Sequence, residues 1–101
     1  MIARRTTVYE RVAAYRRAAE AQRHRSKVLN SNFERLAEVM REILRAHVPE
    51  AFRDTDAFEL VDLMLSFEAW SRLRREQNLP VKRARAILET HVRRLLDSVP
   101  G

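Results

Sequence analysis

Three histidines are the first side chains in this sequence that could bind a metal ion or transfer a proton. They are His24, His47 and His91. A metal site would need two or three of them at a helical spacing such as i, i+4, or near carboxylates on one face. They fall in three different predicted helices, without HExxH-type spacing. His47 and His91 lie on apolar stripes, so we expect hydrogen-bonded core residues there and no metal ion.

The other patterns that carry catalysis are absent from the sequence. There is no Cys, which excludes disulfides, zinc–thiolate sites and thiol chemistry. No Ser lies in a GxSxG turn, and no glycine-rich loop could hold phosphate, because the one Gly is the last residue. Carboxylates such as Asp54 and Asp56, or Glu59 and Asp62, stand near a predicted helix start, where capping accounts for them. We therefore expect no catalytic residue, no cofactor and no enzymatic activity.

Positive charge is concentrated at the amino-terminal end of the chain. The net charge is +6. Residues 1–27 hold eight basic and two acidic residues, whereas the remaining residues hold twelve of each. Such an excess is typical of a surface that meets a polyanion. We favour a solvated, arginine-rich helix, because the cations point all round the helix and no aromatic side chains alternate with them.

The composition predicts helices. The chain has 101 residues, of which 46% are apolar and 34% charged, as expected for a single globular domain over residues 1–101. One Gly and three Pro are too few for a sandwich or barrel, which needs a turn about every ten residues. We expect an all-α bundle of four to five helices. No apolar run of about 18 residues and no secretory signal occur, so we expect no membrane span and a cytoplasmic location.

Apolar periodicity predicts two helices in the first half of the chain. The first runs from about Thr6 to Lys27 and has a thin apolar stripe. The second starts near Ser31, which forms a capping-box pattern with Glu34, and ends before Pro49. The two could also merge across residues 28–31. Two i,i+3 ion pairs are expected along the second helix, Glu38–Arg41 and Glu42–Arg45.

Two further helices are predicted in the second half, and both are unusually apolar. The third runs from Asp54 or Thr55 to about Gln77, with Asn78 as a left-handed stop, and the fourth has Pro80 in its first turn. The third is apolar nearly all round, and the stripe of the fourth is about 180° wide, which exceeds what a small monomer can cover. We therefore expect a homodimer in which the last two helices of each subunit form a four-helix bundle. The expected interface residues are Phe58, Val61, Leu65, Ala69, Ile87, Leu88, His91 and Leu95.

Aromatic and methionine side chains on different helices could line a cavity for a small apolar ligand. The expected lining residues are Tyr15, Phe33, Met40, Met64 and Phe67. The thin stripe of the first helix would underfill the space opposite the second, and methionines adapt to ligands of varied shape. Close packing without a cavity is the alternative. Trp70 follows a buried run on the third helix, so we expect a packing anchor there and not a ligand contact.

Three parts of the sequence resemble TetR-type transcriptional regulators. The stretch LMLSFEAWSRLRREQNL, from Leu63 to Leu79, resembles the penultimate helix of that family. There a Ser-Phe/Trp-Glu-Ala-Trp core is followed by Leu-Arg-Arg and a short turn. Residues 84–89 with Leu95 and Leu96 are similar to the family's last helix. Residues 9–12, 16–19 and 25–26 are similar to the middle helices of one branch, which often has Pro where this chain has Ala14.

The resemblance covers most of the chain and corresponds to the C-terminal two-thirds of such a regulator, without the N-terminal helix-turn-helix. It implies an all-helical effector-binding and dimerisation domain. The last two helices would make the dimer, the preceding ones would enclose a ligand cavity, and DNA would be contacted only through the missing domain. Two alternatives stay open. One is a stand-alone basic dimer that binds nucleic acid non-specifically through residues 1–27, with an affinity that falls steeply with salt. The other is a structural interaction module without a ligand.

Overall fold

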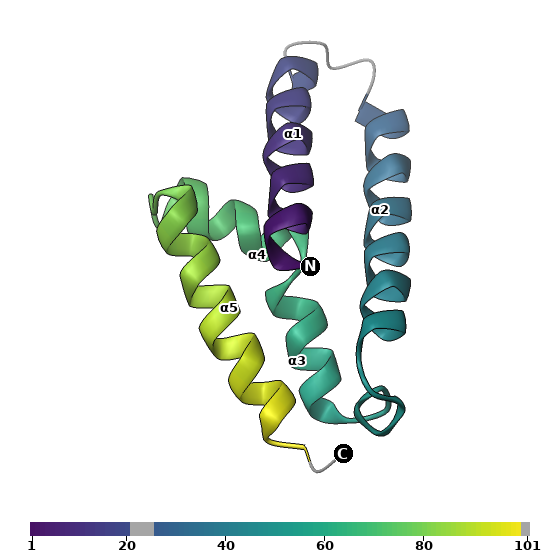
Figure 1. Cartoon of the computed structure of the whole chain (residues 1–101). Coiled ribbons are helices and arrows are strands. Elements are labelled where there is room, and N and C mark those ends of the chain that lie inside the picture. Colours follow the sequence, from purple (N-terminus) through teal and green to yellow (C-terminus); the bar gives the residue numbers. More distant parts are fainter. Residues whose placement is uncertain (21–25, 100–101) are drawn as a thin grey trace.

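The computed structural model describes residues 1–20 and 26–99, and within these ranges the side chains of residues 19, 20 and 26–34 are left undescribed. The helices are α1 (Ile2–Glu20), α2 (Ser26–His47), α3 (Asp56–Met64), α4 (Phe67–Ser71) and α5 (Val81–Asp97), with a short 3-10 turn η2 (Glu50–Phe52) and a π-helix η3 (Arg72–Glu76) (Figure 1). The described residues form no strand, which confirms the expected all-α fold.

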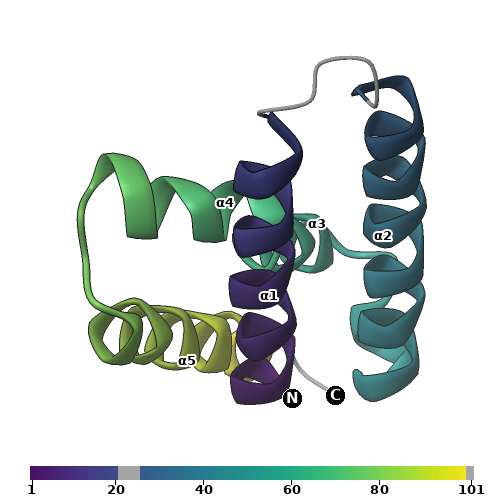
Figure 2. The same ribbon diagram turned by 90° about the horizontal axis from the view of Figure 1, so that it is seen from above.

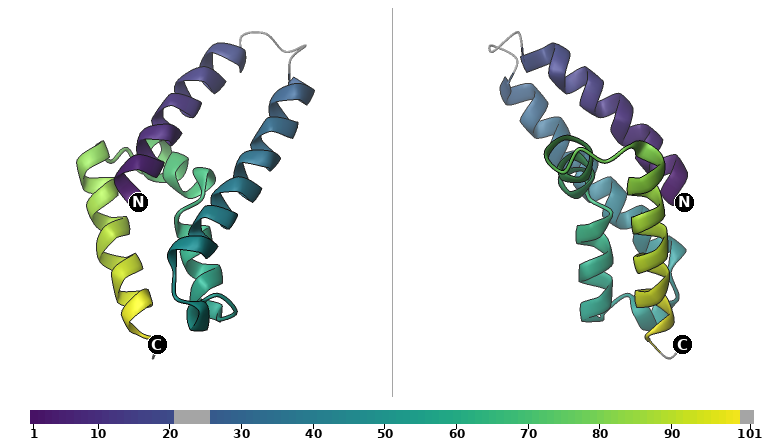
Figure 3. Two further views of the ribbon diagram at one scale, coloured as in Figure 1. Left: turned by 45° about the vertical axis from the view of Figure 1, so that its right-hand side comes forward. Right: turned by 90° about the vertical axis from the view of Figure 1, so that its left-hand side faces the viewer.

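The helices form two groups that meet at α1. Seen from above, α1 lies between α2 on one side and α4 with α5 on the other (Figure 2). The helices α3 and α5 pack against one another and run alongside each other (Figure 3). No helix in the described ranges is long and apolar enough to cross a membrane.

A single apolar core joins all five α-helices. Its buried members are Tyr9, Ala13, Leu44, Val48, Phe52, Phe58, Val61, Leu65, Phe67, Trp70, Ala84, Leu88 and Val92. Burying one large apolar side chain stabilises the fold by about 1.5–3 kcal/mol, so these residues supply the main driving force. Trp70 is 1% exposed, which confirms its expected place as a packing residue.

The prediction of one continuous helix from residue 54 or 55 to 77 is wrong. Its start is as expected, because the side chain of Thr55 accepts a hydrogen bond from the backbone N–H of Phe58 at 3.2 Å. The helix then breaks after Met64. Ser66 takes an extended conformation and caps α4 by accepting a hydrogen bond from the N–H of Ala69 at 3.1 Å. A serine cap inside an apolar run interrupts the helix without changing the hydrophobic pattern.

The joint between α4 and α5 has an unusual form. The helix widens at η3, where the N–H of Gln77 donates to the carbonyl of Arg72, five residues back, at 2.9 Å. Asn78 then adopts φ 57°, the expected left-handed stop, and the N–H of Leu79 donates back to the carbonyl of Leu73 at 3.0 Å. Pro80 directly precedes α5. This joint turns the chain so that α5 returns along α3.

The amino-terminal boundaries differ from the predicted ones. The helix α1 begins at Ile2, several residues before the expected start. The helix α2 begins at Ser26, so Ser31 lies inside the helix rather than at its cap. The weak capping preference of Ser and Asn is overridden when the flanking turns continue as helix.

Candidate functional site

A cleft of about 450 Å³ lies between α1, α2 and the region where α3 gives way to α4. Its volume falls within the range of about 300–1,000 Å³ typical of small-molecule sites. The apolar lining residues are Leu36, Ala37, Met40, Leu63, Leu65 and Phe67. The polar lining residues are Arg5, Tyr9, Glu59, Asp62, Ser66 and Glu68. The lining is therefore half apolar and half polar, and four of its residues are charged.

The carbonyl of Leu65 anchors α1 at the cleft. Tyr9 donates a hydrogen bond from its hydroxyl to this oxygen at 2.7 Å, and Nη1 of Arg5 lies 3.4 Å from the same atom. Nη2 of Arg5 also donates to the carbonyl of Met40 on α2 at 2.8 Å. In a continuous helix the Leu65 carbonyl would accept from Ala69, whose N–H is instead bound by Ser66. The break between α3 and α4 thus creates the acceptor that α1 uses.

The face that α1 presents to the cleft is partly polar. Arg5 and Tyr9 are four residues apart and share one side of the helix. Tyr9 packs edge-to-face on Phe67, with ring centroids 5.6 Å apart, and the guanidinium of Arg16 lies 6.0 Å from the centroid of the same ring. Burial raises the pKa of the Tyr9 hydroxyl, and the neighbouring Arg5 partly opposes this shift. The hydroxyl stays protonated and can donate.

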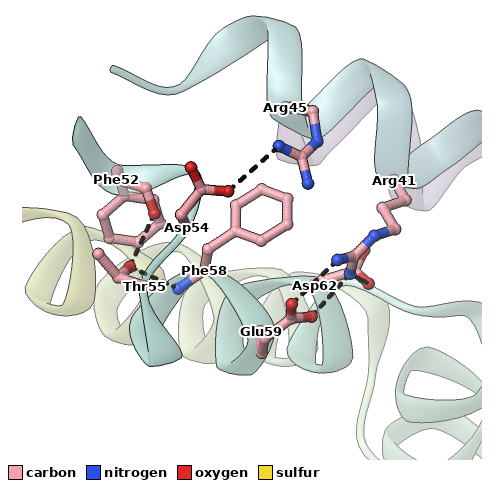
Figure 4. A network of polar contacts seen from close by, with 8 residues as sticks. All are labelled: Arg41, Arg45, Phe52, Asp54, Thr55, Phe58, Glu59 and Asp62. Carbon is pink, nitrogen blue, oxygen red and sulfur yellow. Dashed lines mark hydrogen bonds and ion pairs between the residues drawn. The ribbon is translucent and has the colours of Figure 1, made fainter. Parts of the chain in front are cut away.

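A network of charges ties α2 to α3 at one edge of the cleft (Figure 4). The two terminal nitrogens of Arg41 donate to the carboxylate of Glu59 at 2.7 and 2.9 Å, and Nη1 also contacts Asp62 at 2.7 Å. These bonds hold the pKa of Glu59 below its usual range and raise that of Arg41. Arg45 lies 3.7 Å from Asp54. The expected pairs Glu38–Arg41 and Glu42–Arg45 within α2 are wrong. Arg41 binds residues of α3 instead, and Arg45 lies near Asp54, just before α3.

Glu10 lies on the opposite side of α1 and is bound from α4 and η3. Its carboxylate accepts a hydrogen bond from Nε1 of Trp70 at 2.9 Å and two from Arg74, at 2.8 and 3.2 Å. Arg74 also donates to the carbonyl of Leu79 at 2.8 Å. The hydrogen bond from Arg74 is the main cause that lowers the pKa of Glu10. This side of α1 is closed by a satisfied polar cluster.

The expected cavity lining is found in part. Met40 and Phe67 line the cleft, whereas Met64 packs against the core and is absent from the lining. Tyr15 is 62% exposed and lies away from it. The side chain of Phe33 lies outside the described residues. The stripe through Tyr15 is not the inner face of α1, which instead passes through Arg5 and Tyr9.

The expected dimer residues divide into two sets. Phe58, Val61, Leu65 and Leu88 lie in the core of the single chain and have no surface to offer in this conformation. Ala69, Ile87 and Leu95 are half-buried, and His91 is exposed. The exposed large apolar residues of α3 are instead Leu60, 49% exposed, and Leu63, 64% exposed, which also lines the cleft. The apolar pattern could not indicate which side of the helix the chain itself covers.

The expected core positions of His47 and His91 are wrong. His47 and His91 are both exposed rather than buried, because they lie at the margins of their apolar stripes. Nδ1 of His47 lies 2.8 Å from the carbonyl of Ile43. His24 lies outside the described residues. The described ranges contain no group of three or more His, Asp or Glu residues that could hold a metal ion.

The arginines of residues 1–27 do not all face solvent. Arg5 is buried at the cleft and Arg16 is half-buried against Phe67. Exposed positions within the described part are Arg4, Arg11 and Arg17. Arg23, Arg25 and the side chain of Lys27 fall outside it. Part of the positive charge therefore belongs to the interior of the fold.

Comparison with known proteins returns no match: no family model, no curated protein and no solved structure resembles this chain significantly.

Proposed function

We propose that this chain is an effector-binding and dimerisation domain of the kind found in TetR-type transcriptional regulators, and that the cleft is its effector site. The observation that carries the proposal is the cleft itself, about 450 Å³ between α1, α2, α3 and α4. Small-molecule sites combine apolar side chains with polar groups that orient the ligand, and this cleft has six lining residues of each kind.

The sequence resemblance supports the same proposal. Residues 63–79 resemble the penultimate helix of the TetR family, and their first part supplies much of the cleft. Leu63, Leu65, Ser66, Phe67 and Glu68 all line it. Five of the twelve lining residues thus lie in the stretch that resembles a known effector domain.

Exposed apolar side chains support the dimer. Leu60 is half exposed on α3, and α5, which packs against α3, carries half-buried Ile87 and Leu95. Apolar side chains left uncovered on one face of a domain are typical of a protein interface. A second copy that packs on α3 and α5 would cover them.

The cleft can be tested by filling it. We expect the neutral dye N-phenyl-1-naphthylamine to bind with a rise in fluorescence, and we expect Ala37→Phe to weaken that binding about tenfold or more, because a ring at position 37 occupies the cleft. Ala46→Phe is the matched control. Both alanines are exposed on α2, and nine residues place them on opposite sides of the helix. Equal binding by both variants, or no binding by the unmodified chain, would refute the effector site.

A further inference from the structure

We propose that the ligand of the cleft is a monocarboxylate with an apolar body, and that Arg5 is the residue that binds its carboxylate. This inference rests on the proposed function, since it names the chemical class of the effector. It starts from a buried charge that the fold leaves without a counter-ion.

Arg5 is 4% exposed and lines the cleft. A buried guanidinium usually pairs with a carboxylate, because an isolated charge is costly to remove from water. Arg5 forms no ion pair with any described residue. It donates to two backbone carbonyls, those of Met40 at 2.8 Å and Leu65 at 3.4 Å, and it also lies against the neutral hydroxyl of Tyr9. The charge is held in place by the fold, and its electrostatic partner is missing.

One of these two hydrogen bonds can be given up. The 3.4 Å distance from Nη1 of Arg5 to the Leu65 carbonyl is longer than the usual range of about 2.7–3.2 Å. The same carbonyl also accepts from Tyr9 at 2.7 Å, so it stays satisfied when Nη1 turns to a ligand. A charge-assisted bond from guanidinium to carboxylate is about twice as strong as a neutral one. A carboxylate in the cleft would therefore gain a strong bond at little cost to the protein.

The apolar half of the lining fits an apolar body. Leu36 and Met40 on α2 face the cleft from one side, and Phe67 on α4 lines it from another. Apolar area removed from water contributes about 25 cal/mol per Å². A ligand that is charged throughout would lose this contribution.

The carboxylates of the cleft do not reverse this preference. Glu59 and Asp62 are both paired with Arg41, which offsets their charge. Glu68 is exposed and has no ion-pair partner among the described residues. A cationic ligand would have to pair with Glu68 in water, where such pairs contribute little. A carboxylate meets Arg5 at a buried position, where charge interactions are stronger.

Three probes that share the same ten-carbon alkyl group and differ in the charge of the head group test the inference. Decanoate, 1-decanol and decylammonium are titrated into the full chain at pH 7.5 in competition with N-phenyl-1-naphthylamine, below their micellar concentrations. We expect decanoate to bind about tenfold more tightly than decanol, and decylammonium to bind more weakly than decanol. Equal or tighter binding of decanol or decylammonium would overturn the carboxylate and leave the effector site in place. No competition by any of the three, together with no dye binding, would overturn the proposed function itself.

Two substitutions test whether the carboxylate of the ligand binds Arg5. Arg5→Lys keeps the positive charge but lacks the planar fork, so we expect about a tenfold loss for decanoate and no change for decanol. Glu68→Gln leaves the buried residues untouched, so it decides the question even if Arg5→Lys does not fold. It should strengthen decanoate binding about two- to threefold and weaken decylammonium binding. Weaker decanoate binding by Glu68→Gln would contradict the assignment to Arg5.

Discussion

The two sides of α1 are held by different means. On the side of α4 and α5, Glu10 binds Trp70 and Arg74, and Arg85 donates to the hydroxyls of Thr6 and Thr7 at 2.6 and 2.9 Å. On the side of α2, a single hydrogen bond between described residues crosses from α1, the bond of Arg5 to the Met40 carbonyl. The first side is the hydrogen-bonded side, although a shallow hollow of about 770 Å³ also lies there between the start of α1 and α5, and the second side opens into the cleft.

This difference separates stability from binding within one helix. Regions with few contacts open at low free-energy cost, and ligand sites are drawn from such regions. The hydrogen-bonded side fixes α1 on α4 and α5, so the side that faces α2 can admit a ligand without loss of the fold. Substitutions on the two sides should therefore affect different measurements.

The largest effect on stability is expected from Trp70→Ala on the hydrogen-bonded side of α1. Loss of a fully buried ring, and of the hydrogen bond to Glu10, should lower the free energy of unfolding by about 3–5 kcal/mol. Urea denaturation followed by circular dichroism measures it. Tyr15→Ala on α1 is the control, and because Tyr15 is 62% exposed its cost should stay within about 0.5 kcal/mol. A Trp70→Ala protein as stable as the unmodified chain would show that this side is not what holds the fold.

Acid pH should lower the stability of the chain by protonating Glu10, which binds Trp70 and Arg74 on the hydrogen-bonded side of α1. Its pKa in the folded chain lies below the ordinary value of 4.5, so the unfolded chain takes up a proton at higher pH than the folded chain does. The stabilisation is therefore complete well above pH 4.5 and is lost as the pH falls through 4.5 to the lower folded value. Glu10→Gln should cost about 1 kcal/mol at pH 7, a value reduced for partial exposure, and the difference from the unmodified chain should vanish towards acid pH.

Urea denaturation at several pH values gives both curves. Glu59, whose pKa is also lowered, is present in both proteins, so their difference isolates Glu10. A difference that stays constant down to the lowest pH would mean that Glu10 acts through packing rather than through its charge.

The smallest effect on folding is expected at Leu60, which lies outside both sides of α1. Leu60→Asp should change the free energy of unfolding by no more than about 0.5 kcal/mol, because the residue is half exposed, and should convert the proposed dimer to a monomer. Light scattering at tens of micromolar protein measures the mass. Leu88 would be a poor choice for this test, since it is buried and a charge there would unfold the chain. A monomeric unmodified chain would refute the dimer.

Local signals in the sequence predict much of the fold. Thr55, Asn78 and Pro80 mark helix ends through their own backbone and side-chain preferences, and the structure places each at a helix boundary. The break at Ser66 escaped prediction because its apolar neighbours keep the same period on both sides. A serine followed by a first-turn glutamate, Glu68, was the one local signal for it.

The candidate site was less predictable, because it depends on contacts between distant residues. Met40 and Phe67 could be proposed from their chemical type. Arg5 was counted as a surface cation, since arginine is seldom buried. Its burial, and that of Tyr9, follows from the Leu65 carbonyl, which lies 60 and 56 residues further along the chain. The spacing of four residues puts Arg5 and Tyr9 on one face of α1, but it does not identify the Leu65 carbonyl as their acceptor.

The distance between α1 and its partners along the chain also bears on how the protein is made. The bonds of α1 reach forward by 35 residues to Met40, by 60 to Trp70 and by 79 to Arg85. Chains grow at about 5–20 residues per second, so Thr6 waits about 4–16 s for Arg85 to be synthesised. Tyr9 waits for a shorter time, because its acceptor Leu65 lies 56 residues further along the chain, and until then it has neither acceptor nor neighbouring ring. We therefore expect that α1, although it is synthesised first, is the last helix to dock. A nascent chain that ends before Leu65 should be the form most accessible to chaperones and proteases.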